Sequence, residues 1–180
     1  LVGMPADTIE TSRGCPNRCK FCSITHMYGR TFRTYSEERI IEDLTSIRAS
    51  GKKAVFIVDD NITHDIGHFR NVCRIIRENG LNDMQYVVQV AAAGIAKSPD
   101  LVSEMAAANF RYVFVGFEAM LPSKLKGLKK PTSPEVNRRA AELLNRHDMA
   151  VVAGAIVGYP EDTAQSIRQN CKLIRKLKPD

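Results

Sequence analysis

Four apolar runs recur along the chain, each bounded by polar residues, and a shorter extended segment precedes them. The runs are rich in β-branched and aromatic residues without a clear alternation of polar and apolar positions. This composition is typical of strands, and the continuous apolar run at residues 54–58 predicts a strand buried on both faces of a sheet. The five predicted strands cover residues 8–12, 54–58, 86–90, 112–117 and 150–157.

Between the strands, apolar residues recur every three or four positions, which predicts amphipathic helices. Residues suited to capping a helix N-terminus stand before them. They are Ser36, Ser98, Ser133 and Thr163. Residues 120–132 are an exception, because Pro122, Gly127 and Pro131 favour a loop there.

Strand and helix alternate from one end of the chain to the other, so we expect an α/β fold. Parallel strands joined by right-handed helical crossovers follow from this order. The order alone fits two architectures, an open doubly wound sheet and a curved barrel.

Composition places the chain among ordinary globular proteins. It has 180 residues, of which 44% are hydrophobic and 26% charged, enough for one core. No apolar run approaches the ~20 residues of a membrane helix and no signal peptide opens the chain, so we expect a cytoplasmic protein. The net charge of +6 is typical of a solvated surface and does not by itself indicate nucleic-acid binding.

Three cysteines lie within eight residues, at Cys15, Cys19 and Cys22, directly after the first predicted strand. One tight loop can direct these thiolates toward a common point, as an iron–sulfur cluster requires. Three ligands leave one iron open, which is typical of a catalytic rather than a structural metal. A zinc site completed by His26 is the alternative, in a nucleic-acid-binding protein. Disulfides are disfavoured for such closely spaced cysteines in a reducing compartment.

Polar residues also follow other predicted strands. Asp59 and Asp60 end the second strand, Glu118 ends the fourth, and residues 158–161 follow the fifth. In parallel α/β folds the functional groups collect at the C-terminal ends of strands. The pattern therefore predicts one site shared with the cysteine loop.

The segment GCPNRCKFC at residues 14–22 resembles the C-x3-C-x-aromatic-C loop of the radical S-adenosylmethionine superfamily. The flanking residues 10–16 and 28–30 resemble the branch that carries an upstream cobalamin-binding domain. The resemblance implies a partial (β/α)6 TIM-like barrel with parallel strands, a 4Fe–4S cluster on the three cysteines, and S-adenosylmethionine on the open iron. Residues 1–180 are then a core-domain fragment that stops before the sixth strand, without its flanking domains.

The resemblance also implies which residues contact the nucleotide. Asp59 and Asp60 stand where many members have Gly-Gly-Glu, which contacts the methionine amino group; Asp60 is favoured, because side chains alternate along a strand. Glu118 stands where members contact the ribose or methionine end, and Phe21 is expected over the cluster and the adenine edge. Simpler alternatives exist for each residue. The two aspartates could be solvated turn residues, Glu118 could lie at the surface, and Phe21 could be a hydrophobic anchor.

Residues 154–161 match the G-x-I-x-G-x-x-E stretch of the same family, whose backbone lies against adenine. The implied contact residues are Gly154, Ile156, Gly158 and Glu161. Glycine suits such a position because it lets the backbone approach a flat ligand closely. The alternative for these glycines is turn formation at a strand end.

The remaining cysteines, histidines and lysines are expected to have structural or surface positions and no part in the site. Cys73 and Cys171 lie on apolar helix faces and are expected to be small buried hydrophobes. His64, His68 and His147 are expected at the surface, and the four lysines of residues 124–130 in a solvated loop.

The function implied by the resemblance is reductive cleavage of S-adenosylmethionine to a 5′-deoxyadenosyl radical. The cobalamin-type features suggest methyl transfer, with methylthiotransferase and oxidoreductase chemistry as further options. The partner implied is a flavodoxin- or ferredoxin-like electron donor. Substrate recognition is expected in the barrel lumen, the sixth strand and the flanking domains.

Overall fold

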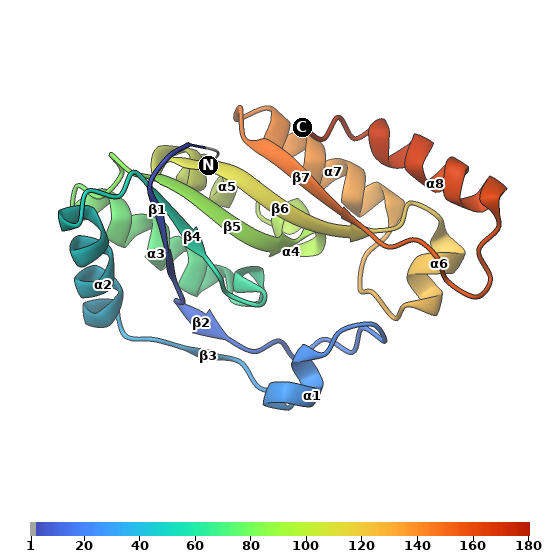
Figure 1. Ribbon diagram of the computed structural model, residues 1–180, viewed down its shortest axis with the longest axis horizontal. Coiled ribbons are helices and arrows are strands. Elements are labelled where there is room, and N and C mark those ends of the chain that lie inside the picture. Colours follow the sequence, from blue (N-terminus) through green and yellow to red (C-terminus); the bar gives the residue numbers. More distant parts are fainter. Residues whose placement is uncertain (1–2) are drawn as a thin grey trace.

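In the computed structural model, which describes residues 3–180, five parallel strands form one sheet in the order β1-β4-β5-β6-β7 (Figure 1). Their bounds are β1 Ala6–Ile9, β4 Ala54–Ile57, β5 Gln85–Ala91, β6 Phe110–Glu118 and β7 Ala150–Ala155. The strands of this sheet follow one another across it in the order in which they occur in the chain. A doubly wound sheet would reverse this order at a switch point. The architecture is therefore a partial, TIM-like barrel, as predicted, and it is open because β1 and β7 are not paired with each other.

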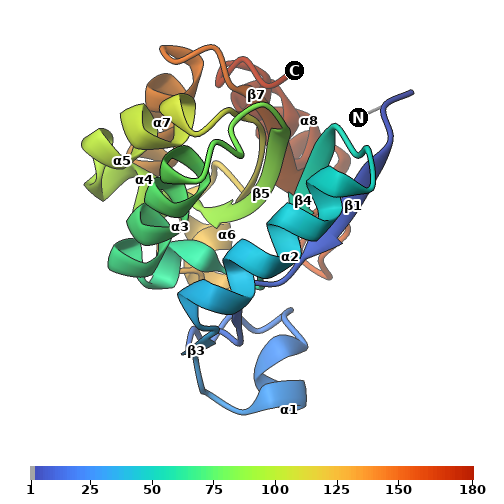
Figure 2. The ribbon, with the colours of Figure 1, turned by 90° about the vertical axis from the view of Figure 1, so that its left-hand side faces the viewer.

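Helices follow the strands and cover the outer side of the curved sheet (Figure 2). They are α2 Glu37–Ala49, α3 Ile66–Glu78, α4 Ala92–Lys97, α5 Pro99–Ala107, α7 Pro134–Asn145 and α8 Ala164–Arg175. Helix α6, Pro122–Gly127, lies instead beyond the C-terminal end of β6 (Figure 1). A short 3-10 helix, η1 Ile62–His64, precedes α3. Among residues 3–180, no helix is long and apolar enough to cross a bilayer.

The hydrophobic core lies between the sheet and these helices. Phe110 sits at its centre, with its ring centroid 5.4 Å from Phe69 and 5.3 Å from Tyr86. All three rings are fully buried. Burial of such side chains contributes about 1.5–3 kcal/mol each, so this side of the sheet provides the stability of the fold.

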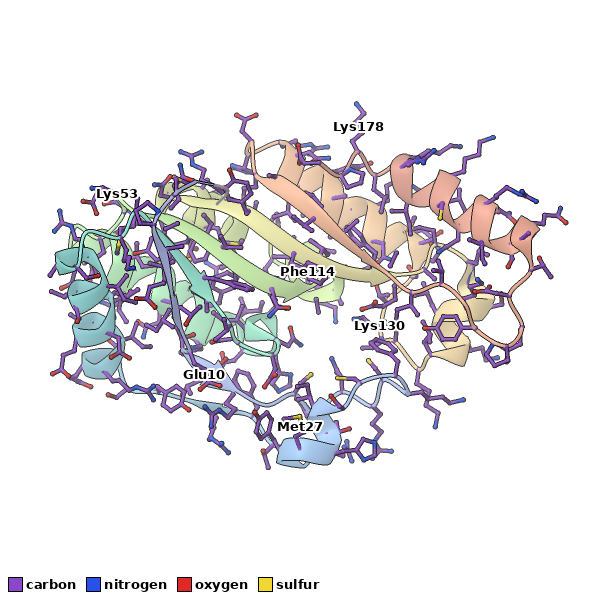
Figure 3. The ribbon with its side chains drawn as sticks, in the orientation of Figure 1. Glu10, Met27, Lys53, Phe114, Lys130 and Lys178 are labelled. Carbon is purple, nitrogen blue, oxygen red and sulfur yellow. The ribbon has the colours of Figure 1, made fainter. Side chains whose placement is uncertain are left out.

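The concave face of the sheet is more open than the sequence predicted. Val58, Phe114 and Val152 are 38%, 38% and 43% exposed, although the strand predicted at residues 54–58 was expected to be buried on both faces. Figure 3 shows Phe114 directed away from the helical layer. That prediction was wrong for this face, because helices cover only the other side of the partial barrel.

Three of the four predicted N-caps make their hydrogen bonds. Ser36 accepts from the Arg39 amide, Ser133 from the Val136 amide, and Thr163 forms a capping box with Ser166. Ser98 precedes α5 but makes no side-chain cap bond.

The loop predicted at residues 120–132 is wrong in its first half, because α6 forms there. Pro122 stands at the start of this helix, where its missing N–H costs no hydrogen bond. Gly127 is its last residue. The breakers thus mark the two ends of a short helix rather than an absence of structure.

A small hairpin frames the cysteine loop, apart from the main sheet. Its strands are β2, Ser12–Arg13, and β3, Arg33–Thr34, which pair antiparallel. Helix α1, Ile24–Tyr28, lies between them, and Figure 1 shows this segment beyond the lower ends of β1 and β4.

The last residue of the chain contacts the free edge of β7. The Asp180 amide donates to the Val151 carbonyl at 3.0 Å, and the Val151 amide donates to the Asp180 carboxylate at 2.8 Å. After α8 the chain has therefore returned to the edge of the sheet that lacks a partner.

Candidate functional site

The three cysteines of the loop line one cavity of about 180 Å³. Cys19 is buried, Cys15 and Cys22 are half-buried, and all three are free thiols. None of them lies in a helix or strand. The loop thus directs three sulfur-bearing side chains to a shared space.

The opposite wall of this cavity comes from the ends of three neighbouring strands. Asp60 and Asn61 follow β4, residues 89–91 end β5, and residues from Phe114 to Glu118 end β6. This is the strand-end position expected for the functional groups of a parallel α/β fold. Thus Asp60, Glu118 and Phe21 meet the cysteines in one place.

Gly14 allows the loop to turn into the site. Its φ is +95°, and a Cβ there would lie 2.3 Å from the Thr31 carbonyl oxygen. Only glycine avoids both the unfavourable backbone angle and the overlap. A backbone hydrogen bond of 3.0 Å from Lys20 to Leu128 ties the other end of the loop to α6.

Asp59 does not face the cavity. It is fully buried and accepts hydrogen bonds from the Thr11 amide (2.7 Å), the Thr11 hydroxyl (2.6 Å) and the Ser12 hydroxyl (2.5 Å). Burial raises the pKa of Asp59, and these three donors oppose the rise. Asp59 therefore anchors the strand that leads into the cysteine loop, and its position argues against contact with a nucleotide.

His68 lies half-buried beside this group of side chains, although a surface position was predicted. Its Nε2 lies 3.1 Å from the Thr11 hydroxyl, and burial lowers the pKa of the imidazole. The surface prediction for His68 was wrong, because the hairpin folds over this part of α3.

Asp60 and Asn61, the two residues after Asp59, also form hydrogen bonds with the segment that enters the cysteine loop. Asp60 accepts from the Gly14 amide at 2.7 Å while lining the cavity. The Asn61 amide nitrogen donates to the Cys15 sulfur at 3.7 Å. Three consecutive residues after β4 therefore hold the segment from Thr11 to Cys15.

Glu118 and Lys130 form an ion pair of 2.8 Å at the cavity wall, with side chains only 11% and 13% exposed. Glu118 has a φ of +60° at a register irregularity of β6, which turns its side chain toward the site. A Cβ on Gly116 would lie 2.6 Å from the Glu118 carboxylate and 3.0 Å from the Lys130 nitrogen. The ends of the two charged side chains therefore lie directly over Gly116.

Lys130 also lies next to the cysteine loop (Figure 3). Its ammonium lies 5.8 Å from the centroid of the Phe21 ring, which is 42% exposed. Burial raises the pKa of the Cys19 thiol, and the Lys130 charge opposes the rise. The prediction of solvated lysines was wrong for Lys130 and for Lys124, which pairs with the buried Asp162.

The residues of the G-x-I-x-G-x-x-E stretch do not line the cysteine cavity. A Cβ on Gly154 would lie 2.9 Å from the Phe114 ring, so a protein side chain occupies that space. The Ile156 amide donates to the Glu118 carbonyl at 2.9 Å. Gly158 is exposed, and Glu161 lines a second cavity whose wall also includes Phe21.

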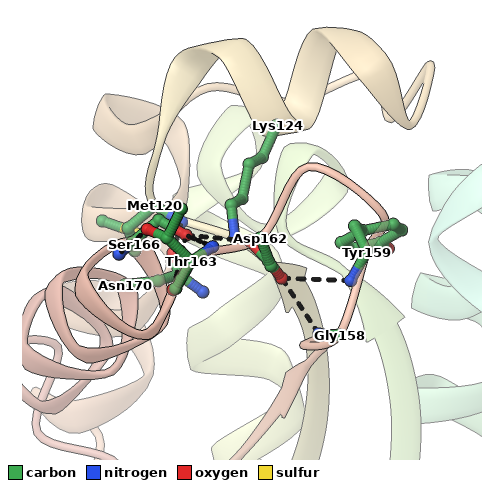
Figure 4. Close-up of polar contacts among 8 residues, drawn as sticks. All are labelled: Met120, Lys124, Gly158, Tyr159, Asp162, Thr163, Ser166 and Asn170. Carbon is green, nitrogen blue, oxygen red and sulfur yellow. Dashed lines mark hydrogen bonds and ion pairs between the residues drawn. The ribbon is translucent and has the colours of Figure 1, made fainter.

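Asp162 holds the turn after β7 in place (Figure 4). Its carboxylate accepts from the amides of Gly158 (2.9 Å) and Tyr159 (3.1 Å) and pairs with Lys124. The hydrogen bond from Lys124 lowers the pKa of Asp162 to about 2. The turn is thus fixed from within and connected to α6.

Cys73 and Cys171 are not among the residues that line the cysteine cavity. Cys73 is buried, and burial raises the pKa of its thiol well above the usual range. Cys171 is half-buried on α8.

The donor set suits an iron–sulfur cluster better than one metal ion. Soft thiolates are the ligands that such clusters use, with each cysteine on a different iron. A single zinc ion needs four donors within about 2.0–2.3 Å. Among residues 3–180, no group of three or more His, Cys, Asp or Glu side chains is arranged to hold one metal ion. The Cys3His alternative with His26 therefore finds no support.

Sequence reasoning missed several residues of the cavity wall, among them Asn61 and Lys130. Asn61 directly follows the acidic pair at a strand end, so position alone could have suggested it. Lys130 lies beyond α6 in a segment without periodicity, and no local signal connects it to Glu118.

Two solved structures have folds closely similar to that of this chain. The first is the radical S-adenosylmethionine methyltransferase TsrM of Kitasatospora setae, with cobalamin and a 4Fe-4S cluster bound; its TM-score is 0.90 at 22% identity, over 98% of this chain and 35% of that one. The second is the cobalamin-dependent S-adenosylmethionine radical enzyme OxsB, with a TM-score of 0.79 at 20% identity, over 92% of this chain and 26% of that one. At these identities the likeness shows the fold.

Sequence relatives extend the similarity. The hopanoid C-3 methylase of Methylococcus capsulatus is 30% identical over 175 residues, which is 96% of this chain and 33% of the methylase. An uncharacterized methyltransferase of Pyrococcus horikoshii is 26% identical over 99% of this chain and 38% of its own length. The chain thus spans about a third of the length of these relatives. The sequence model of the Radical SAM protein family matches residues 9–174, and the chain therefore belongs to the Radical SAM superfamily.

Proposed function

We propose that Cys15, Cys19 and Cys22 hold a 4Fe–4S cluster and that S-adenosylmethionine binds its open iron. The observation that carries the proposal is one cavity lined by all three free thiols and by the ends of β4, β5 and β6. When bound, such a cluster supplies the electron that cleaves S-adenosylmethionine to methionine and a 5′-deoxyadenosyl radical.

The chain's own side chains orient the nucleotide in this proposal. Asp60 accepts a hydrogen bond from the methionine ammonium group, a short charge-assisted contact. Glu118, which Lys130 holds in place, contacts the ribose or methionine end. Phe21 covers one side of the cavity and limits the access of water to it.

In this proposal residues 154–161 shape the lumen and provide the backbone that lies against adenine. Gly154 and Ile156 also support β6 through contacts with Phe114 and Glu118. Gly158 and Glu161 belong to the turn that Asp162 fixes.

We infer that the reaction is methyl transfer with cobalamin held on a further domain. The methylase and methyltransferase relatives, together with the cobalamin in TsrM and OxsB, support this reading.

An acidic flavodoxin- or ferredoxin-like protein is the electron donor in this scheme, since the chain has a net charge of +6. The cytoplasm is the compartment proposed, because it keeps thiolates reduced.

The test is iron and acid-labile sulfide analysis of anaerobically prepared protein. Replacing Cys15, Cys19 or Cys22 by Ala abolishes cluster binding, whereas Cys73→Ala and Cys171→Ala retain it. Loss of the cluster in either distal variant contradicts the ligand assignment, and so does one zinc per chain in the wild type.

A further inference from the structure

Asn61 makes the only side-chain hydrogen bond recorded to a sulfur of the cysteine loop within residues 3–180. Its amide nitrogen lies 3.7 Å from the Cys15 sulfur, a suitable separation for the large sulfur atom. Asn61 is 7% exposed, and it lines the cavity at the C-terminal end of β4. Because this buried amide donates an N–H to the Cys15 sulfur, it can influence the metal group that the sulfur would bind.

The orientation of this amide is fixed by Thr63. The Thr63 hydroxyl donates to the Asn61 side-chain oxygen at 2.7 Å and accepts from the Ala91 amide at 3.0 Å. The single hydrogen of the Thr63 hydroxyl thus points at the carbonyl oxygen of Asn61, which leaves the Asn61 NH2 group on the other side. The nitrogen of Asn61 must therefore face Cys15.

Close packing holds Thr63 itself in place. Thr63 is 6% exposed, and a Cβ on Gly94 of α4 would lie 2.5 Å from the Thr63 Cβ. Helix α4 can approach this closely only because residue 94 is glycine. A chain of three hydrogen bonds therefore connects Ala91, at the end of β5, through Thr63 and Asn61 to Cys15.

Hydrogen bonds to the sulfurs are one of the factors that set the reduction potential of an iron–sulfur cluster. An N–H donor stabilises the reduced cluster more than the oxidised one, because the sulfurs carry more negative charge after reduction. We infer that Asn61, oriented by Thr63, is a positioning residue that raises the reduction potential of the cluster through Cys15. This inference rests on the proposed cluster at the three cysteines.

The test is a redox titration of the anaerobic holoprotein, followed by electron paramagnetic resonance. Asn61→Leu removes the donor without adding charge, and we expect the ratio of reduced to oxidised cluster at a fixed potential to fall about tenfold, equivalent to about 59 mV for one electron. Thr63→Val frees the amide and shifts the midpoint in the same direction. Thr63→Ser keeps the hydroxyl and restores the wild-type value.

Asn71→Leu is the matched control, because Asn71 lies on the exposed side of α3 and bonds only to surface groups. Unchanged midpoints in both Asn61→Leu and Thr63→Val, at normal iron content, overturn the inference and leave the proposed function intact. If Asn61→Leu does not fold, an unchanged midpoint in Thr63→Val overturns it alone. A wild-type protein that binds no iron and sulfide refutes the proposed function instead.

Discussion

Removal of the Asp59 carboxylate should loosen the strand that leads into the cysteine loop. Asp59→Ala deprives three buried donors of their acceptor, namely the Thr11 amide, the Thr11 hydroxyl and the Ser12 hydroxyl. The Thr11 hydroxyl keeps an alternative partner, because His68 Nε2 lies 3.1 Å away. Two donors are then left without a partner in a region closed to water.

An unpaired buried donor costs about 1–3 kcal/mol. We therefore expect Asp59→Ala to lower the free energy of unfolding by about 3 kcal/mol. For a chain of this size each 1 kcal/mol shifts the melting temperature by about 2–4 °C, so Tm should fall by about 6–12 °C. Asp59→Asn retains one acceptor oxygen and should lose about 1 kcal/mol.

Urea unfolding followed by circular dichroism measures these differences. Asp7→Ala is the control, since Asp7 is exposed on β1 and bonds only to the next residue. A free energy of unfolding for Asp59→Ala within about 0.5 kcal/mol of the wild type, the range of ordinary surface substitutions, would refute the anchoring role.

Three further perturbations test other contacts. Gly14→Ala places a methyl group 2.3 Å from the Thr31 carbonyl and should cost about 1–3 kcal/mol in urea unfolding; a wild-type value contradicts the close approach. Lys130→Met leaves the Glu118 carboxylate unpaired and should cost about 1–3 kcal/mol, whereas Lys130→Arg keeps the charge; equal stability of both variants contradicts the pairing. Asp162 has a pKa of about 2 in the folded protein, below its usual 3.8, so its contribution to stability is present above pH 3.8 and is lost as pH falls toward 2. The stability of Asp162→Asn, measured as a function of pH, should lack this loss. A decrease in stability at acid pH equal to that of the wild type contradicts the pKa shift.

The alternation of strands and helices was predictable because apolar spacing and capping residues are local signals. Ser36, Ser133 and Thr163 illustrate this, since each accepts from an amide three residues later in the chain. The same local rules misassigned α6, where Pro122 begins a helix instead of preventing one.

Contacts between distant segments were not predictable from local pattern. Lys130 was expected in solvent, but folding places it against Glu118 and within 5.8 Å of Phe21. Asp59 and Asp60 were correctly expected at one strand end, yet they face different surroundings. The partner of each side chain depends on which loops meet over the sheet, and residue spacing does not encode that.

Electron paramagnetic resonance of the reduced, anaerobic wild-type protein, with and without S-adenosylmethionine, tests the central claim most directly. We predict the signal of a reduced 4Fe–4S cluster and a change in that signal when S-adenosylmethionine is added, because the nucleotide occupies the iron that no cysteine binds. A cluster signal that is identical with and without the nucleotide would contradict an open iron facing the cavity of Cys15, Cys19 and Cys22.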